Sequence, residues 1–363
     1  MATPYSDKMK LQSTADEKRV VSKVEKLINA VEPFSVVGIA DKGKKILHRE
    51  IVRKISEKHG ANYEILHEQI NSSSDYNDFH PKLASLGNKI KNTFVILHFS
   101  TGSDASEYLT LLQELRDLHG PRFVPIVLSD LAPVFDQLTQ NNKLLCRSLI
   151  EYKPFDISDT IALLEVFEKR FDTKISKEMK SEIYKLSGGL SGLIKSLYLY
   201  VIESNHENGL LVKIDKILEI PSILQRLDLI SKDIGYLRCE NMVNKNLNIH
   251  DMKILSQFGV VNAEGHIFSP LLTEYIKNKL ITQPNLPTAT EKKLLEYLQA
   301  NTNTIVSRDQ IAQLMWGEDV QDKYSDWAID QMMHRLRKRF STYNNHSSTL
   351  TTVKKQGFIL KKD

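Results

Sequence analysis

Residues 34–45 read FSVVGIADKGKK, and this stretch decides the fold of the N-terminal part of the chain. Its first half, Phe34 to Ala40, is largely apolar and is typical of a buried strand. Gly38, Gly43 and Lys44 follow at the spacing G-x-x-x-x-G-K, and a helical pattern runs from Ile46 to His59. Glycines let backbone N–H groups wrap a phosphate, and the lysine supplies a point charge. The stretch therefore predicts a strand, a phosphate-binding loop and a helix in succession.

Further strand patterns follow along the chain, with helical patterns such as Glu107 to His119 between most of them. The strand patterns are Tyr63 to Ile70, Thr93 to Ser100, Phe123 to Ser129 and Ser148 to Phe155. Strands rich in Val and Ile without polar alternation belong to a parallel sheet that is covered on both faces. The sequence thus predicts an α/β fold of the nucleotide-binding type, with a parallel sheet.

The loop departs from the pattern that phosphoryl transfer needs. Lys45 stands where a Ser or Thr hydroxyl would hold Mg²⁺, and a lysine cannot ligate magnesium. The strand that would deliver a metal-holding carboxylate ends instead in His98 and Phe99. Both usual supports of the metal ion are therefore missing, which speaks against hydrolysis.

Three stretches together resemble the AAA+/STAND class of P-loop ATPases. Beside the loop, Arg122 to Asp130 looks like the strand that carries a polar sensor, and Leu186 to Gly192 looks like the glycine-bearing lid turn before a helix. The resemblance implies an ATP or ADP site at Gly38, Gly43 and Lys44. The departures at Lys45 and His98 leave nucleotide binding open. The alternative is an inherited ATPase fold that serves as a scaffold or an interaction domain.

Two further segments flank this domain. Ser13 to Val31 is an amphipathic helix pattern, with lysines mostly opposite its apolar side. After the lid, helical patterns precede a hairpin formed by Val260 to Val261 and His266 to Phe268, and Ser269 caps a following helix. Helices followed by a hairpin suggest a winged-helix-like module that packs within the molecule.

The C-terminal part begins after a linker marked by prolines 284 and 287. Two capping-box patterns, Thr288 to Glu291 and Ser307 to Gln310, each open a helix. A third helix begins near Ser325 and places Ile329, Met333, Leu336 and Phe340 on one face. Two final strands, Leu350 to Val353 and Phe358 to Leu360, complete a predicted winged helix-turn-helix.

This part closely resembles the OmpR/PhoB-type winged-helix domain of bacterial response regulators. The matching residues are Ser307-Arg308, Trp316-Gly317, the run from Arg335 to Lys338, and the run from Thr352 to Phe358. Lys355 departs from the family, which usually has a glycine there. No receiver domain that could accept a phosphate is recognisable upstream, so control by aspartyl phosphorylation does not carry over. The resemblance implies double-stranded DNA as the partner.

Charge placement favours DNA independently. Residues 331–362 hold eight Lys or Arg and no Asp or Glu, which suits a phosphate backbone. By resemblance, the third helix enters the major groove and the wing touches the adjacent minor groove. The candidate DNA-binding residues are Gln331, His334, Arg335, Lys338, Lys354 and Lys355. Arg337 and Arg339 are alternatively ion-pair partners within the domain.

Composition excludes several further classes of protein. Two cysteines, Cys146 and Cys239, suit a reducing compartment and exclude a disulfide scaffold or a Cys-based zinc site. The formal net charge of +4 is too small to decide a partner by itself, and no apolar run is long enough to cross a membrane. We expect a cytoplasmic protein without a membrane partner, and the 11 scattered histidines give no support for a metal site.

The sequence therefore predicts a DNA-binding transcription regulator with an inactive ATPase-like domain. The expected domains are an N-terminal helix (1–32), an AAA+/STAND-like P-loop domain with its lid (33–205), a winged-helix-like module (206–282) and an OmpR/PhoB-type winged helix (286–363). One alternative is an active STAND or origin-recognition ATPase that acts on DNA. Another is a non-enzymatic assembly subunit. Self-association or another protein partner is expected through the AAA+-like domain.

Overall fold

The computed structural model describes residues 15–72, 75, 81, 83, 92–203, 214–262, 264–282, 289–317, 326–343, 348–353 and 356–362. The chain divides into two compact units, Met1–Asn278 and Lys279–Asp363. Each unit has its own β-sheet, and each is described by itself below.

The N-terminal unit is built on a five-stranded parallel sheet with the order β2-β3-β4-β1-β5. The strands are β1 (Phe34–Val37), β2 (Glu64–Ile70), β3 (Thr93–Phe99), β4 (Phe123–Ser129) and β5 (Leu149–Glu151). Val37 of β1 and Phe99 of β3 both pair with Ser129 of β4. These three strands therefore end at one level, and the segments that follow them emerge side by side. The predicted parallel sheet is confirmed.

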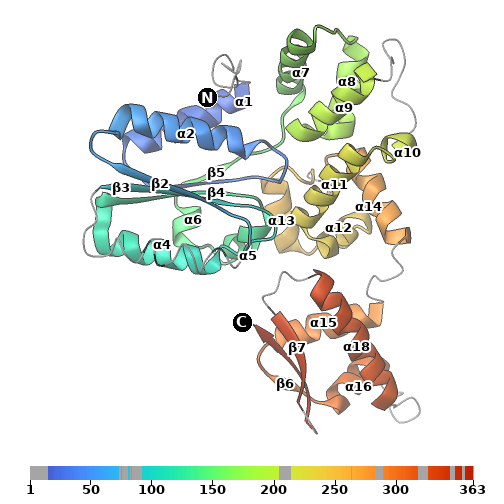
Figure 1. Cartoon of the computed structure of the whole chain (residues 1–363). Helices are drawn as coiled ribbons and strands as arrows, with labels where there is room; N and C mark the ends of the chain where they lie inside the picture. The colour runs from blue at the N-terminus through green and yellow to red at the C-terminus, as the bar shows by residue number, and fades with distance from the viewer. Residues whose placement is uncertain are drawn as a thin grey trace, which may run out of the picture. The chain divides into compact units, whose positions relative to one another are not determined.

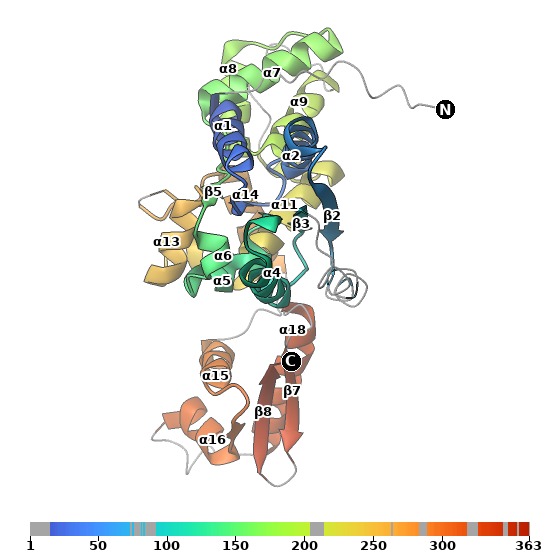
Figure 2. The same ribbon diagram turned by 90° about the vertical axis from the view of Figure 1, so that its left-hand side faces the viewer.

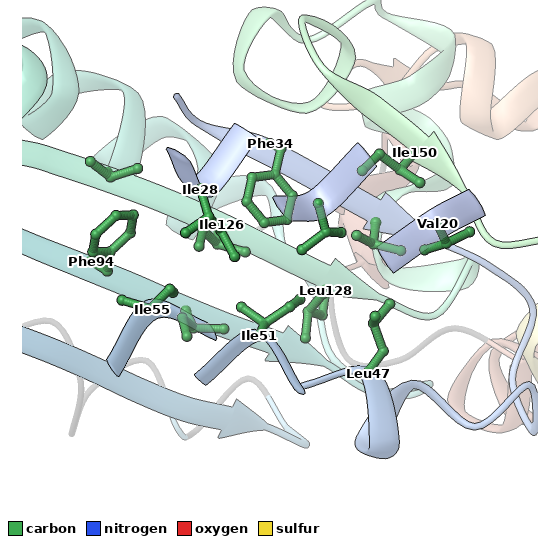
Figure 3. Packing of buried hydrophobic residues seen from close by; sticks show 14 of the residues in the cluster. Val20, Ile28, Phe34, Leu47, Ile51, Ile55, Phe94, Ile126, Leu128 and Ile150 are labelled. Atoms are coloured by element: carbon green, nitrogen blue, oxygen red, sulfur yellow. The ribbon is translucent and has the colours of Figure 1, made fainter. Parts of the chain in front are cut away.

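Helices cover both faces of this sheet (Figure 1). On one face lie α1 (Ala15–Asn29) and α2 (Lys44–His59); on the other lie α4 (Ser106–His119), α5 (Phe135–Thr139) and α6 (Lys143–Cys146). Figure 3 shows how Ile28 of α1 and Ile51 of α2 pack over Phe34 and Ile126 of the sheet. Each of these four side chains is at most 1% exposed. This apolar contact fixes α2, and with it the loop that precedes α2, against the sheet.

The lid expected after the sheet consists of α7 (Ile157–Phe171), α8 (Lys177–Ser187) and α9 (Ser191–Glu203), which pack against one another (Figure 2). The glycine-bearing turn lies between α8 and α9, where Gly188 and Gly189 both have positive φ. A Cβ at Gly189 would lie 2.0 Å from the carbonyl oxygen of Phe155. Only glycine allows this close approach of the turn to the segment after β5.

The strand expected over Ser148 to Phe155 is shorter than predicted, because the chain leaves the sheet after Glu151. Pro154 lacks the N–H that a ladder needs, and the Phe155 N–H donates to the carbonyl of Gly189 in the lid turn instead. The apolar residues Tyr152 and Phe155 are buried there all the same. Because these residues are apolar, the sequence pattern wrongly assigned them to the strand.

The segment after the lid contains α10 (Ile214–Ile217), α11 (Pro221–Ile234), α12 (Tyr236–Val243), α13 (Ile249–Gln257) and α14 (Pro270–Thr282). Ser269 caps α14 as predicted, since its hydroxyl accepts from the Leu272 N–H at 3.1 Å. The predicted hairpin is reduced to one antiparallel bridge between Val261 and Ile267. The Asn262 side chain accepts from the Glu264 and His266 N–H groups, which closes the turn.

The C-terminal unit has the predicted winged helix-turn-helix fold. Its elements are α15 (Ala289–Ala300), β6 (Ile305–Val306), α16 (Arg308–Trp316), α18 (Asp326–Tyr343), β7 (Ser348–Val353) and β8 (Gly357–Lys362). The sequence predicted two strands, but β6 adds a third to the antiparallel order β6-β8-β7. Gly357 makes this possible, because a Cβ there would lie 2.1 Å from the carbonyl oxygen of Val306.

A separate core holds the C-terminal unit together. Leu294, Leu298, Ile311, Ile329, Met333, Leu336 and Phe358 are at most 1% exposed and form one cluster. The capping box at Ser307 and Gln310 is present in both directions, as predicted, and fixes the start of α16. Across both units, none of the helices that the structure describes is long and apolar enough to cross a membrane.

Candidate functional site

Residues 38–43, which the sequence predicted to bind phosphate and which are called the phosphate loop below, join β1 to α2. A Cβ at Gly38 would lie 2.4 Å from the carbonyl oxygen of Tyr152, and Gly43 has a φ of 92°. Both positions therefore need glycine, one for close approach and one for its backbone conformation. The loop follows the carboxyl end of β1, which is level with the ends of β4 and β3, so it emerges at the same edge of the sheet as the residues that follow those strands.

The Lys44 side chain is buried and its ammonium group is fully engaged within the protein. Its Nζ donates to the carbonyl oxygens of Gly38 at 2.8 Å and Ile39 at 2.7 Å. It also forms an ion pair with Asp130 at 2.8 Å. A lysine ammonium has three donors, and these three contacts use all of them. The charge that would attract a phosphate is thus directed to a carboxylate of the same chain.

Asp130 directly follows β4, at the end of the stretch that resembles a sensor strand. Its carboxylate accepts from the backbone N–H of Thr101 at 2.8 Å and from the Thr101 hydroxyl at 2.9 Å. Burial opposes the charge of Asp130, but the Lys44 ammonium and the Thr101 hydrogen bonds hold its pKa below the usual value. Asp130 is therefore an anion that is paired with Lys44.

A second carboxylate, Asp233 near the end of α11, reaches the same place from a distant part of the chain. It accepts from the backbone N–H groups of Ala40 at 2.6 Å, Ala132 at 2.8 Å and Leu131 at 3.2 Å. The Thr101 hydroxyl lies 3.1 Å from its Oδ1. Complete burial, and after it the charge of Asp130, raises the pKa of Asp233 to about 6. Asp233 thus occupies one backbone donor of the loop after β1, the N–H of Ala40, and two donors of the segment after β4.

The loop is further held by α9 and α11. The Ser191 hydroxyl and the Gly192 N–H both donate to the backbone carbonyl of Asp41, at 3.1 and 3.2 Å. The side chain of Asp41 forms an ion pair with Arg226 of α11. The loop is therefore bound to the lid and to α11 through one residue, Asp41.

Lys45 and His98 occupy the two positions at which the sequence lacks a magnesium ligand. Lys45 is exposed on the first turn of α2, and His98 of β3 is 4% exposed. Burial lowers the pKa of His98 to about 4, so its imidazole is neutral at neutral pH. Within the ranges that the structure covers, no group of three or more His, Cys, Asp or Glu side chains is arranged to hold a metal ion.

Helix α18 presents a polar face in the C-terminal unit. Gln331 and His334 are exposed, whereas Ile329, Met333 and Leu336 are buried in the core. At 100° per residue, positions 335 and 338 fall on the same side of the helix as 331 and 334. Arg335 and Lys338 belong to α18, but their side chains lie outside the described residues, as do Lys354 and Lys355 altogether.

Two arginines of the C-terminal unit have hydrogen-bond or ion-pair partners within the same unit. The Arg337 guanidinium donates to the carbonyl of Leu350 at 3.0 Å and to the Thr352 hydroxyl, which ties α18 to β7. Arg308, at the start of α16, forms ion pairs with Asp326 at 2.9 Å and Asp330 at 2.5 Å. The sequence suggested an ion pair for Arg337, whereas its guanidinium is hydrogen-bonded to a backbone carbonyl and a hydroxyl within the unit.

Sequence reasoning missed Asp233 and its link to the loop, although a signal was present. Ile223, Leu227 and Ile230 define the buried face of α11, and Asp233 continues this series three residues later. A charged residue on an apolar stripe requires a buried partner. The partner could not be found from the sequence, because Ala40 precedes Asp233 by 193 residues.

Comparison with known proteins gives one family match. Residues 283–360 match the family model described as "Transcriptional regulatory protein, C terminal". No curated protein matches the chain in a sequence search. The winged helix of the OmpR/PhoB type that the sequence predicted is confirmed by this match and by the observed fold.

Solved structures with a similar fold include Cdc6p from Pyrobaculum aerophilum, at 11% identity and a TM-score of 0.39, covering 99% of this chain and 92% of that one. AMPPCP-bound DnaA from Aquifex aeolicus is 13% identical with a TM-score of 0.37, covering 78% of this chain and 92% of that one. The Orc1 protein of Aeropyrum pernix, solved in complex with DNA, is 7% identical with a TM-score of 0.34, covering 95% and 88%. These likenesses are remote and concern the fold alone.

Proposed function

We propose that this protein is a DNA-binding transcription regulator that reads double-stranded DNA with α18 of its C-terminal winged helix. The observation that carries the proposal is the position of Gln331 and His334. Both are exposed on the side of α18 opposite its buried face, in a domain that matches the C-terminal part of transcriptional regulatory proteins. An α-helix fits the major groove, and Gln and His side chains can hydrogen-bond to base edges there.

The basic residues would supply affinity. Arg335 and Lys338, on the same side of α18 by helical spacing, are proposed to contact phosphate or bases. Lys354 and Lys355 lie between β7 and β8 in the sequence and are proposed to serve the wing. The absence of Asp and Glu from residues 331–362 supports this assignment, because acidic groups would repel the phosphate backbone.

The N-terminal unit is proposed to act as a scaffold of the AAA+/STAND type that does not hydrolyse nucleotide. Three features support this: the engaged Lys44 ammonium, the lysine at position 45, and the neutral His98 in place of a carboxylate. Gly38, Gly43 and Lys44 remain candidate contacts for ATP or ADP. We also propose that this unit carries the surface for self-association or for binding another protein. We retain the proposed division into 1–32, 33–205, 206–282 and 286–363, and a cytoplasmic location.

This function is tested by measuring the affinity of the full chain for a pool of fluorescent DNA duplexes. Fluorescence anisotropy reports that affinity at several salt concentrations. We expect affinity to fall steeply with salt, as counterion release requires. The Gln331→Ala/His334→Ala variant should lose preference among sequences while it keeps the salt-dependent part. Gln299→Ala, which removes an exposed glutamine from α15, is the matched control and should change neither quantity. A full chain with no salt-sensitive affinity for duplex DNA would contradict the proposal.

A further inference from the structure

Helix α11 directs two opposite charges onto the phosphate loop. Arg226 forms an ion pair with Asp41, and Asp233 accepts from the N–H of Ala40. The two residues are seven positions apart, so they lie on one side of the helix. Neighbouring residues of the loop are therefore bound by one face of α11, which belongs to a segment far from the loop in sequence.

The Asp233 carboxylate is seated between two segments that follow strands of the sheet. Ala40 belongs to the loop after β1, while Leu131 and Ala132 follow β4. The Asp233 Oδ2 accepts from the N–H groups of Ala40 and Leu131, and its Oδ1 accepts from the Ala132 N–H. The Thr101 hydroxyl, which donates to Asp130, also lies 3.1 Å from Oδ1. A phosphate oxygen bound to this loop would use the same kind of backbone donor.

We propose that the Asp233 carboxylate is a built-in ligand of the phosphate loop, which excludes polyphosphates from the loop while it holds α11 against the sheet. This inference goes beyond the proposed function, because it concerns how the loop and α11 are coupled and does not depend on DNA binding by α18.

Electrostatics makes the two ligands mutually exclusive. The site already contains the Asp130 carboxylate near Asp233, and the Lys44 ammonium is ion-paired with Asp130. A further multiply charged anion in this buried place would face both carboxylates, and like charges repel strongly where water is excluded. Polyphosphate can bind only after the Asp233 carboxylate leaves.

Departure of Asp233 would also affect α11. The carboxylate is fully buried and is bound by three backbone N–H groups, so it cannot withdraw without a shift of the end of α11 or local unfolding there. Occupation of the loop is thereby coupled to the position of α11. The coupling is reciprocal: a shift of α11 that withdraws the Asp233 carboxylate from the Ala40 N–H would open the loop.

The test uses the full chain and inorganic pyrophosphate, titrated by isothermal calorimetry. Wild type should give no binding heat up to about 1 mM pyrophosphate, which corresponds to binding weaker than about −4 kcal/mol. Asp233→Ala should bind at least about tenfold more tightly, because the backbone donors become free and one negative charge is removed. Asp233→Asn keeps the size but not the charge and should lie between the two.

Arg226→Ala is the matched control. It removes the other contact of α11 with the loop but leaves Asp233 in place, so it should not gain pyrophosphate binding. Equal gains in Arg226→Ala and Asp233→Ala would show that mere loosening of α11 opens the loop, and the proposal would be wrong. Wild-type binding as tight as that of Asp233→Ala, or folded Asp233 variants that bind no pyrophosphate, would overturn it as well.

A measurement on the wild type alone covers the case in which the Asp233 variants fail to fold. The amide hydrogens of Ala40 and Ala132 should exchange slowly with solvent and should not slow further when pyrophosphate is added. Fast exchange at these amides, or protection that appears only with pyrophosphate, would show that the carboxylate does not occupy them. DNA binding by the same samples reports separately on the function proposed for α18.

Discussion

The Asp233 carboxylate accepts a hydrogen bond of 2.6 Å from the backbone N–H of Ala40, across 193 residues of chain. This contact joins the end of α11 to a loop whose sequence is typical of phosphate binding. Together with the ion pair between Lys44 and Asp130, it supplies protein partners to groups that a nucleotide would otherwise engage. The Lys44 ammonium and the Ala40 N–H of this loop are thus both engaged by carboxylates of the same chain.

We predict that the protein releases no phosphate from ATP above background. Lys44 is engaged by Asp130 and two carbonyls, and neither Lys45 nor His98 can support Mg²⁺, so charge on a transferring phosphoryl group would not be neutralised. Steady-state phosphate release should be the same for wild type and Lys44→Ala. Robust turnover that Lys44→Ala abolishes would make the protein an ATPase and contradict the scaffold role.

Stability should depend on pH through Asp233. Because its folded pKa is raised to about 6, the folded state binds a proton that the unfolded state lacks between about pH 4 and pH 6, and stability falls as pH rises through that window. Asp130, whose pKa is lowered, acts in the opposite sense and only at lower pH. Asp233 should contribute a slope of up to about 1.4 kcal/mol per pH unit to the free energy of unfolding in this window. Asp233→Asn should lose that contribution. Urea unfolding from pH 4 to 7 measures it, and parallel profiles for the two proteins would contradict the assignment.

Arg337 and Lys338 should behave differently although they are neighbours. Arg337→Ala removes hydrogen bonds to Leu350 and Thr352 and should destabilise the C-terminal unit by about 1–2 kcal/mol. Lys338→Ala should leave stability nearly unchanged but weaken binding to all DNA sequences and flatten the salt slope by about one unit. Thermal unfolding and anisotropy separate the two effects. A stability loss confined to Lys338→Ala would reverse the assignment.

The C-terminal unit, residues 279–363, should fold when it is expressed alone. It has its own buried cluster around Ile329, Leu336 and Phe358 and its own antiparallel sheet. Urea unfolding followed by circular dichroism should show one cooperative transition. A fragment that lacks such a transition would mean that the unit depends on the rest of the chain.

The sequence predicted those parts of the fold that depend on local patterns. The apolar runs around Phe34 and Phe94 and the capping box at Ser307 indicated strands and helix starts, because burial and capping act on neighbouring residues. Apolar residues near Phe155 misled the strand prediction, since they are buried against the lid and not in the sheet. The strand at Ile305 was missed because two residues carry no periodicity.

The candidate site was only partly predictable for the same reason. Gly38, Gly43 and Lys44 follow one another in the sequence, so their spacing identified the loop. The carboxylates that engage the loop come from β4 and α11, and which distant acid meets which donor is decided by tertiary packing. Asp233 on the apolar face of α11 showed that a buried partner exists but could not show that this partner is Ala40.

Selection of DNA from a random duplex library by the full chain, followed by sequencing, tests the regulator account most directly. The account predicts one enriched motif, bound roughly 10³-fold or more tightly than random duplex at physiological salt. This preference should be lost in Gln331→Ala/His334→Ala and kept in Gln299→Ala. A library that shows no enriched sequence after selection with wild type, or the same enriched motif with the double variant, would contradict the claim that α18 reads DNA.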